Sequence, residues 1–180
     1  MGAAAHMLER CLAGETVVIG IGNRWRGDDA AGPALIDRLV GRVTARCLDA
    51  GDAPERHLGA AMAGAPDTIL LADAVDFGGA PGQVAVFSGP DLPDRFGTTH
   101  DVPLGVLMRY LEALSGAAVL LLGIQPAHTT FGAPMSAEVL ASVDLVGQML
   151  SARLRAGAAA EGGARPETPG QPTCEGGGSQ

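Results

Sequence analysis

Apolar residues recur along the chain in short runs that are separated by amphipathic stretches. Several runs are continuous and do not alternate with polar residues, which is typical of strands covered on both faces of a sheet. The pattern predicts five strands, at residues 16–21, 44–49, 68–73, 83–88 and 118–124.

Helical periodicity occupies most of the intervals between these runs. The predicted helices are residues 31–40, 54–63, 102–114 and 137–155. The predicted buried faces are Leu104, Leu107, Met108, Leu111 and Leu114 in the third helix, and Val139, Val143, Val146 and Leu150 in the fourth. Asp101 and Ser136 stand where N-caps are expected. Strands separated by helices predict an α/β fold with right-handed crossovers and a largely parallel sheet.

One connection departs from this alternation. Residues 74–82 read AVDFGGAPG, which is too short for a helical crossover and rich in turn formers. The strand at 83–88 is therefore predicted to follow the preceding strand in a hairpin and to run antiparallel to its neighbour.

The chain length of 180 residues allows one domain with a substantial core. We assign residues 16–156 to this domain and residues 1–15 to an N-terminal extension. Residues 157–180 combine Gly, Pro, Ala and polar residues without apolar periodicity, so this tail is predicted to be disordered.

Charge and cysteine content exclude several classes of partner. The net charge is −8 with only 12 Lys and Arg residues, so a basic stripe for nucleic acid or an anionic membrane is not expected. No apolar run approaches the ~20 residues needed to span a bilayer. Three cysteines do not make a disulfide framework, which favours a reducing, cytoplasmic location.

Polar residues concentrate where the predicted strands end. They are Asp28 and Asp29 after the first strand, Asp49 and Asp52 at the second, Asp73 at the third, His100 in a later loop, and Gln125 after the fifth. Doubly wound sheets bind ligands at this carboxyl edge. Carboxylates with one imidazole suit a divalent metal such as nickel or zinc. Each residue also has a structural interpretation as a cap or turn former, which suits Asp28 and Asp49 best.

Common catalytic motifs are missing, which leaves more than one function open. The sequence contains no GxSxG elbow, no HExxH and no Walker loop. Gly20, Gly22 and Asp49 are compatible with a nucleotide-dependent oxidoreductase, although Trp25 occupies the position of the third glycine of GxGxxG. A metal-binding maturation chaperone that cuts nothing would use the same acids and histidine.

Six motifs in order resemble one known family. GIGN, GDDAAGP, DAGDAPE, LLADAVDFGGAPGQV, TTHDVPLGVLMRYL and LGIQP extend from about residue 16 to residue 150. Together they resemble the hydrogenase maturation proteases, endopeptidases specific for the large subunits of [NiFe] hydrogenases. TTHDVPL and LGIQP are most similar to the branch that serves formate hydrogenlyase-type hydrogenases. Ala30 stands where the common family pattern has a glycine, which affects the expected local turn.

The resemblance implies a three-layer α/β/α sandwich with a five-stranded, mostly parallel sheet and one antiparallel strand. It implies removal of a C-terminal extension from a [NiFe] hydrogenase large-subunit precursor after nickel insertion. Asp29, Asp73 and His100 match the residues that contact the metal and carry the reaction, with nickel carried by the precursor and not held by the free enzyme. We expect Asn23, Asp49 and Gln125 to support them.

Overall fold

The structure is a computed structural model that describes residues 2–89 and 103–155. The predictions made for His100, Asp101 and the tail at 157–180 lie outside the described residues. No helix in the described part of the chain is long and apolar enough to cross a membrane.

One five-stranded sheet forms the centre of the molecule, in the order β2-β1-β3-β5-β4. The strands are β1 (Thr16–Ile21), β2 (Arg46–Gly51), β3 (Thr68–Ala74), β4 (Val84–Ser88) and β5 (Ala118–Ile124). The first three and β5 are parallel, and β4 runs antiparallel to β5. The predicted direction of β4 is confirmed, but its partner is not the preceding strand, because β5 inserts between β3 and β4.

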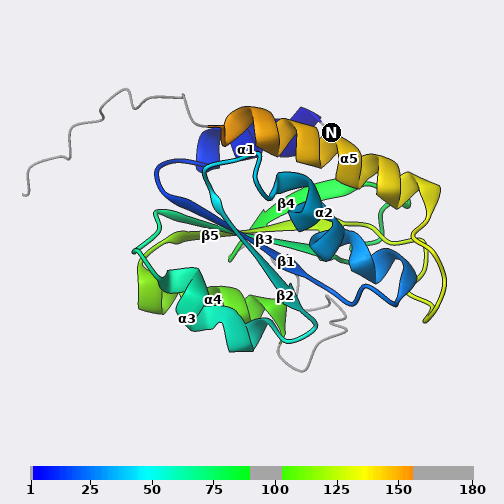
Figure 1. Cartoon of the computed structure of the whole chain (residues 1–180), viewed down its shortest axis with the longest axis horizontal. Helices are drawn as coiled ribbons and strands as arrows, with labels where there is room; N and C mark the ends of the chain where they lie inside the picture. Colours follow the sequence, from blue (N-terminus) through cyan, green and yellow to red (C-terminus); the bar gives the residue numbers. More distant parts are fainter. Residues whose placement is uncertain (1, 90–102, 156–180) are drawn as a thin grey trace, which may run out of the picture.

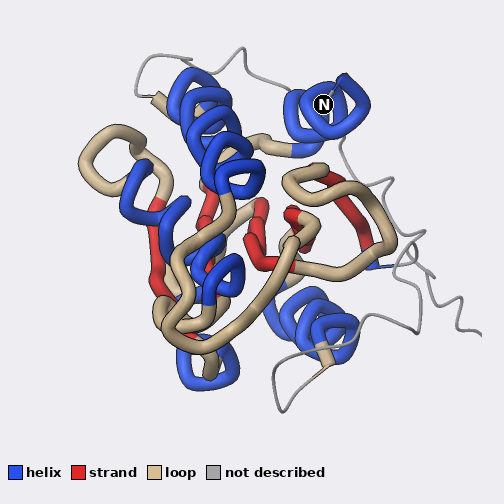
Figure 2. The backbone as a smooth tube through the Cα atoms, turned by 90° about the vertical axis from the view of Figure 1, so that its right-hand side faces the viewer, coloured by secondary structure: helices blue, strands red, loops and turns tan. Residues whose placement is uncertain are grey.

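Helices cover both faces of this sheet (Figures 1 and 2), which confirms the three-layer sandwich. On one face lie α1 (Gly2–Cys11), α2 (Ala31–Leu39) and α5 (Ala137–Arg153). On the other lie α3 (Leu58–Met62) and α4 (Leu104–Ser115). Each face has its own apolar core: Leu35, Val143 and Leu150 contribute to the first, and Leu107 and Met108 to the second.

Most predicted elements lie within two residues of the observed ones, and three differences matter. The segment predicted as a helix at 54–63 is divided into a 3₁₀ turn, η2 (Pro54–His57), and the short α3. Helix α1 was not predicted, although Leu8 and Leu12 are buried in the core beneath it. Leu114 was assigned to the buried face of α4 and is instead 56% exposed, because it lies in the last turn of the helix.

Candidate functional site

The loop after β1 folds tightly back onto the end of its own strand. We call residues 22–30, which include the 3₁₀ turn η1 (Gly27–Ala30), the site loop. Gly22 has φ +133°, and a Cβ there would lie 1.8 Å from the carbonyl oxygen of Asp29. A Cβ on Gly20 would lie 2.5 Å from the carbonyl oxygen of Gly32 in α2. These glycines therefore allow α2 to begin directly against the sheet, which accounts for the motif without a dinucleotide.

Asn23 connects the acids of the site loop and of the loop after β2. Its backbone N–H donates to Oδ2 of Asp29 at 2.9 Å, and its side-chain Nδ2 donates to Oδ2 of Asp52 at 3.2 Å. Its Oδ1 accepts the N–H of Trp25 at 2.9 Å. Asn23, Arg26, Asp29 and Asp52 line one cavity of about 270 Å³. Asn23 therefore lies beside Asp29 at the cavity, and its supporting role stays a prediction.

Asp29 and Asp73 are brought to the same edge of the sheet by elements in contact. Asp29 is 1% exposed on η1, and Asp73 is 2% exposed near the end of β3. The η1 turn contacts β3, and a Cβ on Gly32 would lie 2.4 Å from the carbonyl oxygen of Ala72, the residue before Asp73. Two of the three predicted site residues therefore come from neighbouring elements. The third, His100, lies outside the described residues.

Asp28 has a structural role, as its sequence position favoured. Its fully buried carboxylate accepts the N–H groups of Ala127, His128 and Ser136, at 2.7, 3.1 and 2.6 Å, and the Ser136 hydroxyl at 3.0 Å. Burial opposes ionisation of this carboxyl, but these four hydrogen bonds outweigh it and lower the pKa of Asp28. Asp28 therefore attaches the site loop to the β5–α5 loop (residues 125–136) as a charged group.

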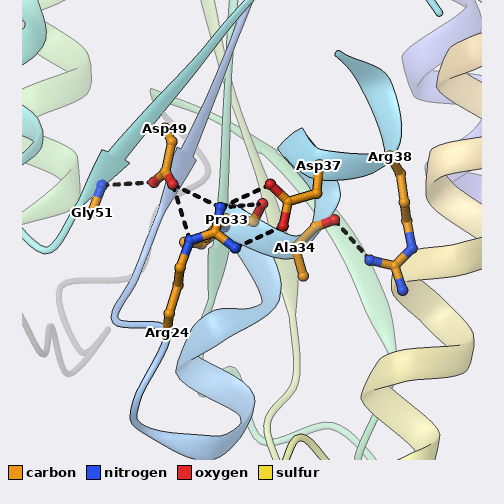
Figure 3. A network of polar contacts seen from close by, with 7 residues as sticks. All are labelled: Arg24, Pro33, Ala34, Asp37, Arg38, Asp49 and Gly51. Atoms are coloured by element: carbon orange, nitrogen blue, oxygen red, sulfur yellow. Dashed lines mark hydrogen bonds and ion pairs between the residues drawn. The ribbon is translucent and has the colours of Figure 1, made fainter. Parts of the chain in front are cut away.

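Asp49 also has structural partners, which Figure 3 shows as one network with Arg24. The Arg24 guanidinium contacts Asp37 of α2 at 2.6 Å and Asp49 of β2 at 2.8 Å, and donates to the carbonyl oxygen of Pro33. These bonds raise the pKa of Arg24 and lower the pKa of Asp37. Asp49 further accepts the N–H of Gly51, as in an Asx turn. Asp49 therefore holds Arg24, near the start of the site loop, against β2.

Gln125 supports the loop that follows Asp73 and does not line the cavity. Its Oε1 accepts the N–H groups of Phe77 and Gly79, at 2.9 and 3.0 Å, and its Nε2 donates to Asp76 at 3.0 Å. The bond from Gln125, together with the N–H of Gly78, lowers the pKa of Asp76. All these contacts fix the β3–β4 connection.

Two cavity residues were not singled out as site residues from the sequence. Asp52 was placed at the right strand end but not selected, and Arg26 was overlooked because basic residues in loops have no distinctive pattern. Ala30 adopts φ −75° and ψ −1°, so the missing family glycine imposes no strain at this turn. Within residues 2–89 and 103–155, no three His, Cys, Asp or Glu residues cluster in a way that could hold a metal.

Known proteins resemble this chain in both sequence and fold. The family model for hydrogenase maturation protease (HycI) matches residues 35–152. The hydrogenase 3 maturation protease of Escherichia coli K12 is 34% identical over 137 residues, which are 74% of this chain and 87% of that protein.

Two solved structures extend the likeness to three dimensions. The crystal structure of the [NiFe] hydrogenase maturation protease HycI from Thermococcus kodakarensis KOD1 has a TM-score of 0.76 and 29% identity, covering 82% of this chain and 98% of that one. The solution structure of the endopeptidase HycI from Escherichia coli has a TM-score of 0.69 and 33% identity, covering 77% and 90%. The chain therefore belongs to the hydrogenase maturation protease family and is an endopeptidase.

Proposed function

We propose that this protein removes the C-terminal extension of a [NiFe] hydrogenase large-subunit precursor once nickel has been inserted. Its relatives are named as proteases of hydrogenase maturation. The observation that supports a chemical role most directly is the pair of buried carboxylates, Asp29 and Asp73, at one sheet edge, where Asp29 lines a cavity. The reaction would take place in the cytoplasm, in keeping with the free thiols of Cys11 and Cys47.

The described residues that line the cavity supply carboxylates and no hydroxyl or thiol. Among the four residues that line it, none is Ser, Thr or Cys. In our proposal, a water molecule is therefore the attacking group in peptide hydrolysis at this site. Carboxylate oxygens can both orient such a water and contact a divalent metal.

Nickel enters this scheme as part of the substrate. In our proposal, the precursor's cysteines hold the ion, and Asp29, Asp73 and His100 complete or test its coordination. A precursor without nickel would have no metal ion for these side chains to coordinate, so it would not be cut. Cleavage would then occur only after nickel insertion. The first role of the metal is positioning of the scissile bond.

The test compares nickel-loaded with nickel-free precursor and weighs the products. Wild-type protein should shorten only the nickel-loaded precursor. Asp29→Asn, Asp73→Asn and His100→Ala should each abolish processing while the melting temperature stays near that of wild type, because each removes a ligand and little core volume. Asp144→Asn is the control, since that carboxylate pairs with Arg38 between α2 and α5.

The outcomes separate the parts of the proposal. Full-rate cleavage by all three variants would remove the basis for the site. Equal cleavage of nickel-free precursor would leave the peptidase function standing and refute its dependence on nickel insertion.

A further inference from the structure

Two aromatic side chains stand exposed, one on the site loop that lines the cavity and one on the β5–α5 loop bonded to it. Trp25 is 70% exposed and Phe131 is 72% exposed, and large apolar side chains are usually buried. We call this pair the aromatic rim. Trp25 follows the site loop's Asn23 by two residues and precedes Arg26, and both of these line the cavity. The Cα atom of Trp25 is therefore only about 3.8 Å from the Cα atom of Arg26, a residue that lines the cavity.

The backbone that carries the aromatic rim is fixed by hydrogen bonds. The N–H of Trp25 is held by Asn23 Oδ1 at 2.9 Å. The carbonyl oxygen of Trp25 accepts the N–H of Gly132, the residue after Phe131, at 2.7 Å. Both aromatic residues are therefore attached to one junction between the site loop and the β5–α5 loop.

The same two loops are joined a second time at Asp28. Its carboxylate holds the N–H groups of Ala127 and His128, and its own N–H donates to the carbonyl oxygen of His128 at 3.1 Å. Bonds at Trp25–Gly132 and at Asp28–His128 make the pair of loops a platform with two attachments. Because these loops are already fixed, little conformational entropy is lost when a partner binds. Exposed aromatic side chains on such a fixed backbone can contribute strongly to the affinity of an interface.

We propose that the aromatic rim docks the precursor protein, by contacting an apolar surface next to its cleavable segment. This inference rests on the proposed function. We assign this occupant because Trp25 lies between Asn23 and Arg26 in the sequence, and both of these residues line the same cavity as Asp29. The contact would supply binding that does not depend on nickel and would orient the segment before the acids meet the metal.

The experiment measures precursor binding and cleavage separately. Trp25→Ala, Phe131→Ala and the double variant are compared with wild type, using nickel-loaded precursor whose cleavage is followed by mass and whose affinity is followed by calorimetry with nickel-free precursor. The double variant should weaken binding by roughly 30-fold, as expected for a pair of hot-spot side chains. Its kcat should stay within about threefold of wild type, because the reacting groups are unchanged.

Matched variants distinguish docking from a structural effect. Trp25→Phe should retain most of the affinity, since an aromatic face remains. Tyr110→Ala is the control, because Tyr110 is a half-exposed aromatic on α4, on the opposite face of the sheet from α5. If an alanine variant melts below wild type, Trp25→Gln and Phe131→Gln replace it, since an amide side chain is soluble without being aromatic.

Each result counts for or against the aromatic rim. If the double variant binds the precursor as tightly as wild type and cleaves it normally, the docking role of the aromatic rim is refuted and the proposed function stands. Failure of the wild type to cut any precursor would overturn the function, even if the rim still bound it. A wild-type dimer that the double variant converts to monomers, with precursor affinity unchanged, would assign the rim to self-association and overturn the proposal.

Discussion

The charge on Asp28 should account for a large part of the stability of the site edge, and Asp28→Asn isolates it. In the wild type, Oδ1 accepts the N–H of Ser136, whereas Oδ2 accepts the N–H groups of Ala127 and His128 and the Ser136 hydroxyl. An amide has one oxygen, so its NH₂ group must face at least one of these donors where it meets the buried side chain of residue 28. The substitution therefore keeps the shape of the side chain and removes one of the two oxygens that accept hydrogen bonds.

The magnitude follows from two contributions. A buried N–H left without an acceptor costs about 1–3 kcal/mol. The remaining bonds lose their charge assistance and about half their strength, which adds about 1 kcal/mol. We expect Asp28→Asn to lower the free energy of unfolding by about 2–4 kcal/mol, a large fraction of the ~5–15 kcal/mol typical of a domain.

The stabilisation that Asp28 provides should also decrease as the pH falls. Because hydrogen bonding lowers the folded-state pKa of Asp28, the folded protein binds fewer protons here than the unfolded chain does. The stabilisation is therefore fully present above the ordinary aspartate pKa of about 3.9 and is lost as the pH falls through the folded value. The gap between wild type and Asp28→Asn should close in strong acid.

Urea denaturation followed by far-ultraviolet circular dichroism measures this difference. Fluorescence is a poor probe, because the single tryptophan, Trp25, is already exposed in the folded protein. Asp67→Asn is the matched control: this exposed carboxylate accepts only the N–H of Glu15 among the described contacts and should change stability by about 0.5 kcal/mol or less. A variant at Asp28 as stable as this control, or a gap unchanged in strong acid, would refute the reasoning.

Three further substitutions test other parts of the structure. Gly22→Ala should cost about 2 kcal/mol or more and slow precursor cleavage, because its methyl group would displace the Asp29 backbone; thermal melting and product mass check both effects. Arg24→Ala should cost only about 1 kcal/mol, and less at high salt, because its ion pairs are exposed; urea titrations at two salt concentrations would disprove this by showing a large, salt-independent loss. Leu8→Ala should cost about 2–3 kcal/mol in the same titration, and no change would mean that α1 does not stabilise the domain.

The sequence predicted best the elements whose own residues determine them. The strands at 16–21 and 118–124 were predicted to the residue, because each is a short continuous apolar run that leaves little freedom. Strand β2 extends two residues further than predicted, to Gly51, because pairing with Ile21 continues its ladder past the polar Asp49. Helix α1 has a Gly- and Ala-rich start, so only its packing through Leu8 reveals it.

The candidate site was predictable in part for a similar reason. The family motif, read with strand positions, placed Asp29 and Asp73 at one edge, and turn chemistry favoured a structural role for Asp28. The partners of Asp28 lie 99 to 108 residues further along the chain, and no local pattern identifies donors at that separation. The cavity contact of Arg26 is likewise decided by tertiary packing.

The attachment of Asp28 to the β5–α5 loop sets the order in which the enzyme can be completed during translation. The acids of the site loop are made before one of the donors that hold this loop, because Ser136 follows Asp28 by 108 residues. At ordinary elongation rates of roughly 5–20 residues per second, several seconds separate the two events. A growing chain therefore carries its acids before it can arrange them, and the site loop can reach its final form only after Ser136 has been made.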